Sequence, residues 1–247
     1  MNERSIFRST LRWSAAGIGL AAAGYAAYAG LTWLRFGRPS RPTLDEDDAL
    51  LNQFMPVYDV VERHRIDVAA PAAVTLAAAR EIDLLNTAVV RGLIRTRELI
   101  LGAAPDHRPR PRGLLAELQS MGWVVLAEIP GAEIVGGAVT RPWEANVTFR
   151  SVPPDQFAGF NEPGYVKIAW TLRADAVGEA ASIFRTETRA LATDRSARER
   201  FRRYWSLVSP GIFLIRRVML GPVKTNAERF HGGSSRLAAL DLTRRRL

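Results

Sequence analysis

The chain has 247 residues, of which 47% are apolar, so it can fill the core of one globular domain with an appendage and is not an intrinsically disordered protein. It has no cysteine, which excludes disulfide scaffolds, Cys-ligated metal centres and thiol catalysis. The net charge is +9, but residues 1–41 hold six arginines against Glu3 alone and so supply +5 of it. We attribute the basic character to the flanks of an N-terminal apolar segment and expect no nucleic-acid partner.

Residues 13–34, WSAAGIGLAAAGYAAYAGLTWL, carry no charge and follow a basic N-terminus, residues 1–12. A helix of this length crosses a hydrocarbon core of about 30 Å, and Trp13 and Trp33 stand where an aromatic belt would place them. The alternatives are a buried soluble helix and a cleaved signal peptide, because Ala27-Tyr28-Ala29 resembles a cleavage site. The apolar run continues beyond that site. We therefore predict a transmembrane helix, a single-pass plasma-membrane protein and the lipid bilayer as a partner.

Arginines flank both ends of this segment in equal number, so the positive-inside rule favours neither orientation. Residues 35–53 are expected to form a linker, because two prolines in GRPSRP, residues 37–42, stop the membrane helix. The acidic run from Asp45 to Asp48 is interpreted as a solvated part of this linker. It has too few ligands and no glycine turn for a calcium site.

Residues 54–230 are expected to form the globular domain, which begins with a strand over residues 57–68. Alternation in this strand puts Val60, Glu62, His64, Ile66 and Val68 on one face. Helices follow because apolar residues then recur with helical spacing. The elements expected after the strand are a helix at 72–82, a helix at 84–101 with Gly102 as C-cap, a proline-rich loop at 105–112 and a short helix at 113–121.

Strands dominate the second half of the domain. They are expected at 122–129 and 132–139, joined by a Pro130-Gly131 hairpin turn, then at 146–151, 164–174 and 180–192, with a short helix from 153 to 160. A helix is expected to start at Thr193-Asp194. Pro210-Gly211 should kink or break it, and Gly221-Pro222 should break it again. Residues 231–247 are expected to be a flexible basic tail.

Two groups of residues are candidates for lining a ligand pocket. Glu62 and His64 share one face of their strand and could orient a ligand or transfer a proton. On other strands and on the last helix, apolar and hydroxyl side chains face the same way: Ile168, Trp170, Thr186, Thr188, Phe201, Tyr204 and Trp205. Arg141 and Trp143 lie in a loop that could gate the pocket mouth. The alternatives are that these residues fill an ordinary core, and that Glu62 and His64 lie at a polar sheet end or on an exposed face. Arg185, Glu187 and Arg189, on the opposite face, are expected to form an ion network on the outer surface.

The phrase RHRIDVAAPAAVTLAAARE, residues 63–81, and the phrase TETRALATDRSARERFRRYWSLVSPG, residues 186–211, resemble the helix-grip fold of the START-like, polyketide cyclase and lipid-transfer (SRPBCC) superfamily, in an uncharacterised bacterial branch. The resemblance implies an α+β fold in which a curved antiparallel sheet wraps around a long C-terminal helix. It also implies a cavity for a largely apolar molecule between them. The residues indicate five or six strands, whereas the superfamily has seven.

Several chemistries have no support in the sequence. Phosphate-binding and dinucleotide-binding glycine motifs and the G-x-S-x-G motif are absent, and the three histidines have no metal-ligand spacing. We therefore expect no metal, no cofactor and no catalytic residue, and predict a membrane-anchored protein that binds a lipid or another hydrophobic small molecule. The alternatives are a cyclase-like or hydrolase-like enzyme that uses Glu62 and His64, and an interaction protein at the membrane surface whose core is filled.

Overall fold

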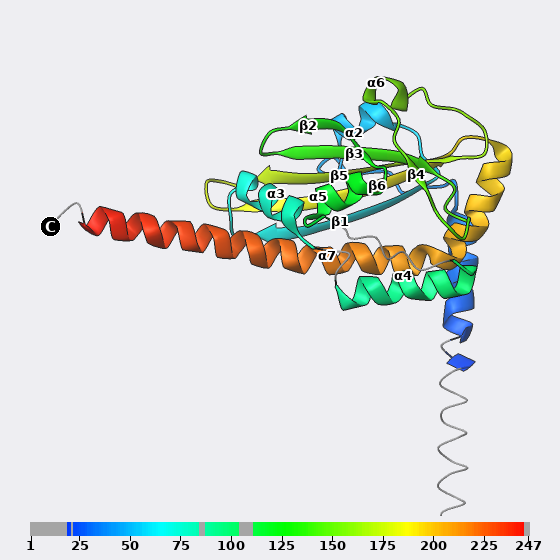
Figure 1. The fold of residues 1–247 in the computed structure, drawn as a ribbon, viewed down its shortest axis with the longest axis horizontal. Helices are drawn as coiled ribbons and strands as arrows, with labels where there is room; N and C mark the ends of the chain where they lie inside the picture. The colour runs from blue at the N-terminus through cyan, green and yellow to red at the C-terminus, as the bar shows by residue number, and fades with distance from the viewer. Residues whose placement is uncertain (1–18, 21, 84–86, 104–110, 245–247) are drawn as a thin grey trace, which may run out of the picture.

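The fold is α+β, with a six-stranded antiparallel sheet and a long C-terminal helix, as the sequence predicts (Figure 1). The computed structural model describes residues 19–244 except 21, 84–86 and 104–110. The strands run in the order β1-β6-β5-β3-β2, with β4 paired to β3. They are β1 (Val60–Val68), β2 (Val124–Ile129), β3 (Glu133–Thr140), β4 (Phe149–Arg150), β5 (Val166–Ala176) and β6 (Ser182–Ala192). The labelled helices are α2 (Ala49–Phe54), α3 (Ala72–Glu81), α4 (Ala88–Leu101), α5 (Leu114–Ser120), α6 (Pro154–Phe157) and α7 (Arg195–Arg244).

Helices cover both faces of the sheet. We call the face toward α3 and α7 the inner face, and the face toward α2 the outer face. On the inner face, Leu172 and Phe184 belong to the same buried cluster as Leu76 of α3 and Met219 of α7. On the outer face, Leu51 of α2 is fully buried in a second cluster. The strand alternation therefore separates two different environments.

Two adjacent glycines in β3 make room for large side chains on the two faces. A Cβ atom on Gly136 would lie 2.3 Å from Cζ2 of Trp170, on the inner face. A Cβ atom on Gly137 would lie 2.6 Å from a Leu126 methyl carbon and 2.8 Å from the Phe157 ring. At the centre of the sheet, large side chains therefore pack directly on the backbone of these two glycines.

Helix α7 is one helix of 50 residues, with Pro210 and Pro222 inside it. It begins as predicted, because an Asp194 carboxylate oxygen accepts the backbone N–H of Ala197 at 3.0 Å. The predicted kink at Pro210-Gly211 is confirmed, because α7 changes direction where yellow passes into orange in Figure 1. The predicted break at Gly221-Pro222 is wrong, because the helix continues through it. The expected tail is also helical as far as Arg244, so the long helix extends well beyond the sheet.

Residues 19–35, with residue 21 outside the described part, form a helix that runs beside the first half of α7 and projects from the domain (Figure 1). The guanidinium of Arg202 lies 4.2 Å from the Trp33 ring centroid, and its Nε donates to the Trp33 carbonyl at 3.0 Å. Residues 13–18 of the predicted membrane segment lie outside the described residues. Within the described residues, one helix is long and apolar enough to cross a membrane by length and composition, Arg195–Gly233, and part of it packs in the core of the domain.

The acidic run led us to expect a solvated linker, but part of the linker is buried against the domain. Asp48 is buried and caps α2, because its carboxylate accepts the backbone N–H of Leu51 at 2.7 Å. Asp45 pairs with Arg65 at 2.9 Å. The segment therefore folds back on the outer face because its carboxylates meet arginines there.

Candidate functional site

The inner face carries a group of polar side chains under α7. Strand pairing places Glu62 opposite Thr188 and His64 opposite Thr186, and on the next strand Trp170 lies opposite Thr188. Directly opposite residues on antiparallel strands have Cβ atoms about 5 Å apart, so these five side chains form one patch. We call this patch the inner polar cluster.

Four atoms of the inner polar cluster are buried without a hydrogen-bond partner. They are Nε2 of His64, Nε1 of Trp170, Oγ1 of Thr186 and Oγ1 of Thr188. Leaving one buried polar group unpaired costs roughly 1–3 kcal/mol, so natural cores rarely contain such a row. The inner polar cluster therefore has hydrogen-bonding capacity that the described residues do not use.

Charge in the cluster is suppressed by burial. Desolvation raises the pKa of the Glu62 carboxyl, and the positive charge of Arg216 offsets part of this rise. Desolvation lowers the pKa of His64, and Arg216 and Arg217 lower it further. At neutral pH His64 is therefore a neutral imidazole with one donor and one acceptor nitrogen. Its Nε2 is 3.9 Å from Oε2 of Glu62, which is too far for a hydrogen bond and leaves both groups able to bind a third atom.

An apolar wall adjoins the polar cluster along the same face. Ile168 packs in a cluster with Phe201 and Trp205, and Tyr204 and Trp143 lie at its margin. Phe213 of α7 closes the other side, because its ring centroid is 4.9 Å from that of His64. The ring of Phe213 is 40% exposed, so it separates His64 from the surface. The site thus combines hydrogen-bonding groups with an apolar surround.

Of the two loop residues predicted to gate the pocket mouth, Trp143 lies at the margin of the apolar wall, and Arg141 lies away from the inner polar cluster. Arg141 stacks on Tyr165, 4.4 Å from the ring centroid, and its Nε donates to the Gly164 carbonyl at 3.2 Å. Trp143 packs beside the Phe201 cluster, where Arg200 lies 5.9 Å from its ring. Nothing in these contacts brings Arg141 to the inner polar cluster, and its interactions are those of a loop that is fixed to the sheet end.

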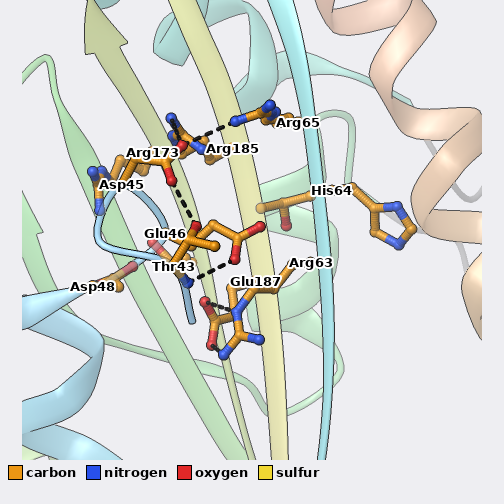
Figure 2. A pocket seen from close by; sticks show the side chains of 12 residues that line it. Thr43, Asp45, Glu46, Asp48, Arg63, His64, Arg65, Arg173, Arg185 and Glu187 are labelled. Carbon is orange, nitrogen blue, oxygen red and sulfur yellow. Dashed lines mark hydrogen bonds and ion pairs between the residues drawn. The ribbon is translucent and has the colours of Figure 1, made fainter. Parts of the chain in front are cut away.

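A cavity of about 350 Å³ lies on the outer face, between the acidic linker and the sheet (Figure 2). Four arginines line it, and each has a carboxylate partner: Arg63 with Glu187, Arg65 with Asp45, and both Arg173 and Arg185 with Asp175. His64 points away from this cavity in Figure 2. Since the guanidiniums already have partners, this cavity needs no anion to balance its charge.

The ion network predicted for this face is present but not superficial. Arg189 and Glu187 are buried and 2.6 Å apart, and Arg189 also donates to the Asn52 side chain and to the Met55 carbonyl. Helix α2 covers them. The pairing therefore fixes α2 to β6, whereas the sequence indicated a solvent-exposed network.

Three contributors to the site escaped the sequence analysis. Phe213 and Arg216 were expected to lie within a resumed apolar helix, and their approach to His64 depends on the continuity of α7 across Pro210. An arginine pair inside the apolar run IFLIRRVML is the signal that could have pointed to Arg216. Trp123, whose Nε1 is also buried without a hydrogen-bond partner, lies 6.4 Å from Trp170 between ring centroids. Within the described residues, no three His, Asp or Glu side chains are grouped as metal ligands.

The chain matches no protein-family model and no curated protein. Its structure is similar to that of a hypothetical protein from Helicobacter pylori, at 6% identity and a TM-score of 0.38, over 76% of this chain and 99% of that one. The di-domain ARO/CYC BexL of the BE-7585A biosynthetic pathway is similar at 16% identity and a TM-score of 0.28, over 68% of this chain and 46% of that one. Norcoclaurine synthase from Thalictrum flavum is similar at 12% identity and a TM-score of 0.26, over 75% of this chain and 95% of that one. Membership of the helix-grip superfamily stays a prediction for this chain.

Proposed function

We propose that the chain is a membrane-anchored helix-grip protein that binds a largely apolar small molecule or lipid, without covalent chemistry, between the inner face of the sheet and α7. The observation that carries this proposal is the row of unpartnered polar atoms on His64, Thr186 and Thr188 beside an apolar wall. A ligand with an apolar body and one or two oxygen atoms would satisfy that row. The neutral state of His64 favours an uncharged polar group over a strong acid.

The projecting N-terminal helix supports the membrane part of the proposal. Its described part exposes large apolar side chains, among them Leu20 at 76% and Leu34 at 64%. Helix α7 is a weaker choice for the membrane span, because Phe201, Met219 and Val223 are buried in the domain. We therefore assign the anchor to the N-terminal segment.

The test uses the full chain, purified from membranes with its native lipids and then extracted with organic solvent for mass spectrometry. A stoichiometric apolar molecule is expected in the extract. Thr186→Val, which removes one unpartnered hydroxyl, should release this molecule while keeping or raising the stability of the empty protein, because an unpaired buried group is lost.

Thr171→Val is the matched control. Thr171 is as buried as Thr186 and lies on the neighbouring strand, but on the outer face, where its hydroxyl donates to Glu133 at 3.0 Å. This variant should retain the molecule and lose about 1 kcal/mol of stability. An empty extract from the wild-type protein, together with destabilisation by Thr186→Val, would refute ligand binding and favour an interaction protein with a filled core.

A second candidate function is an enzyme, and the separation of 3.9 Å between His64 and Glu62 favours it. Two groups at this distance can contact the same atom of a ligand, one as acid and the other as base. His64→Ala should then keep the bound molecule but hold it in a chemically different form from that of the wild type. Identical masses in the two extracts would exclude this function.

A further inference from the structure

Helix α4 has one side against α7 and the other toward solvent. Val90 is fully buried, and Leu93 reaches to within 3.6 Å of the position that a Cβ atom on Gly211 would occupy. On the other side, Val89 is 44% exposed and Leu99 is 84% exposed. Such a helix has an apolar surface for which the described chain provides no cover.

Helix α7 also has exposed large apolar side chains, and the carbonyl of one of these residues, Leu207, contacts Tyr25 of the N-terminal helix. We call the combined area the basal surface, and it comprises Val89, Arg91, Arg95 and Leu99 of α4 with Leu207, Phe213, Leu214 and Arg217 of α7. Arginines and large apolar residues alternate in it. This is the composition of helices that lie in the interface of a bilayer, with apolar side chains in the acyl boundary and cations among the headgroups.

The direction of the N-terminal helix relates the basal surface to a membrane plane. In Figure 1, α4 and the orange part of α7 run across the edge of the domain from which the helix of residues 19–35 projects, and they do not follow its direction. The Tyr25 hydroxyl donates to the Leu207 carbonyl, and the Tyr28 hydroxyl is 3.1 Å from Oγ of Ser209. These contacts hold the N-terminal helix beside the point where α7 turns into the basal surface.

We infer that the basal surface lies on an anionic lipid bilayer, with α4 and the part of α7 that follows Pro210 in the membrane plane. The inference rests on the proposed membrane anchor and adds to it the orientation of the domain. It also gives the ligand site an exit. Phe213, which covers His64, belongs to the basal surface, so a lipid passes its ring directly from the bilayer without crossing water.

The chain has no cysteine, so single cysteines can carry an environment-sensitive fluorophore in the otherwise unaltered full chain. Three exposed apolar positions serve as probes: Leu20 in the anchor, Leu99 in α4, and Ile129 at the end of β2, the sheet edge opposite β1. Each labelled chain is reconstituted in vesicles of phosphatidylcholine with or without phosphatidylglycerol. Quenching by brominated lipid and by aqueous iodide measures the environment of each label.

Brominated lipid should quench the labels at Leu20 and Leu99, and iodide should quench the label at Ile129. The double substitution Arg91→Gln with Arg95→Gln should lower the ratio of lipid-exposed to water-exposed label at Leu99 by tenfold or more in phosphatidylglycerol vesicles, because each arginine near an anionic surface strengthens binding about fivefold. The label at Leu20 should not respond to it. Circular dichroism of the double variant checks that it remains folded.

The outcomes separate the two proposals. A label at Leu99 that only iodide quenches, beside a label at Leu20 that brominated lipid quenches, overturns the basal surface and leaves the anchor intact. A label at Leu20 that iodide quenches overturns the anchor as well. A label at Leu99 that neither reagent reaches shows a protein on this surface and overturns the inference, and equal lipid quenching with and without phosphatidylglycerol overturns the anionic preference.

Discussion

Replacing Glu133 by glutamine probes the junction between the linker and the outer face. Glu133 begins β3, is 7% exposed and accepts a hydrogen bond from Thr171 at 3.0 Å. Burial, together with a hydrogen bond to Asp48 and the negative charge of that residue, raises the pKa of its carboxyl to about 7. The folded protein therefore keeps a proton on Glu133 at pH values where the unfolded chain has lost it.

The sign and size of the effect follow from this difference. The pKa is higher in the folded state than the usual 4.5, so the contribution of Glu133 to stability is complete below pH 4.5 and is lost as the pH rises to about 7. A rise of the pKa from 4.5 to about 7 on folding corresponds to about 3 kcal/mol of the free energy of unfolding, as an upper limit. Glutamine keeps the shape and cannot ionise, so the variant should match the wild type near pH 4 and exceed its free energy of unfolding by up to about 3 kcal/mol at pH 8.

The assay is urea unfolding of the full chain in mild detergent over this pH range, read by tryptophan fluorescence. Infrared difference spectra between pH 5 and pH 8 should show a protonated carboxyl band in the wild type that the variant lacks. Asp48→Asn serves as the control, because it removes the nearby charge and should reduce the slope only in part. A constant difference between variant and wild type from pH 4 to pH 8 would show that Glu133 has the same pKa in the folded and unfolded states, and would refute the reasoning.

Three further substitutions test the packing. Gly136→Ala puts a methyl group 2.3 Å from the Trp170 ring, so it should cost about 1–3 kcal/mol in urea unfolding and change the near-ultraviolet circular dichroism; an unchanged spectrum would contradict this close approach. Arg189→Met leaves the Glu187 carboxylate buried with one partner fewer and should cost about 3–5 kcal/mol by the same measurement, whereas a loss below 1 kcal/mol would show that α2 is not fixed through it. Asp194→Ala removes the α7 cap and should lower the free energy of unfolding by about 1 kcal/mol, which an unchanged urea midpoint would contradict.

Strand alternation was the most informative pattern in the sequence. Side chains on a strand alternate between two faces, so placing Glu62 and Thr186 within strands also determined which residues share their face. The register between β1 and β6 then brings the two sets together. The resemblance led to the same expectation of a sheet and a long C-terminal helix.

Tertiary contacts decided what the sequence did not predict. Prolines normally kink or end helices, so the sequence indicated a kink or a break at Pro210 and a break at Pro222. Helix α7 is packed against the sheet; it bends near Pro210 and continues through both prolines. The acidic run at Asp45 looked like a linker, because its arginine partner Arg65 lies 20 residues away in sequence and its other partner, Arg185, 140 residues away. Phe213 lies beside His64 because α7 is one continuous helix, whereas the sequence pattern indicated three separate helical segments.

The segment between the projecting helix and the sheet is a rigid connection, because it is hydrogen-bonded to the domain. A flexible linker of this length would have an end-to-end distance of about 25 Å and would let the domain move by a similar distance relative to the helix. Here Gly37 donates to the Asp59 carbonyl, Ser40 accepts from Arg63, and the Asp47 carbonyl accepts from Arg173. If the helix spans a bilayer, the domain can rotate about the helix axis and diffuse laterally with it. Its distance from the bilayer surface cannot change, so this distance is the same in every molecule of the protein.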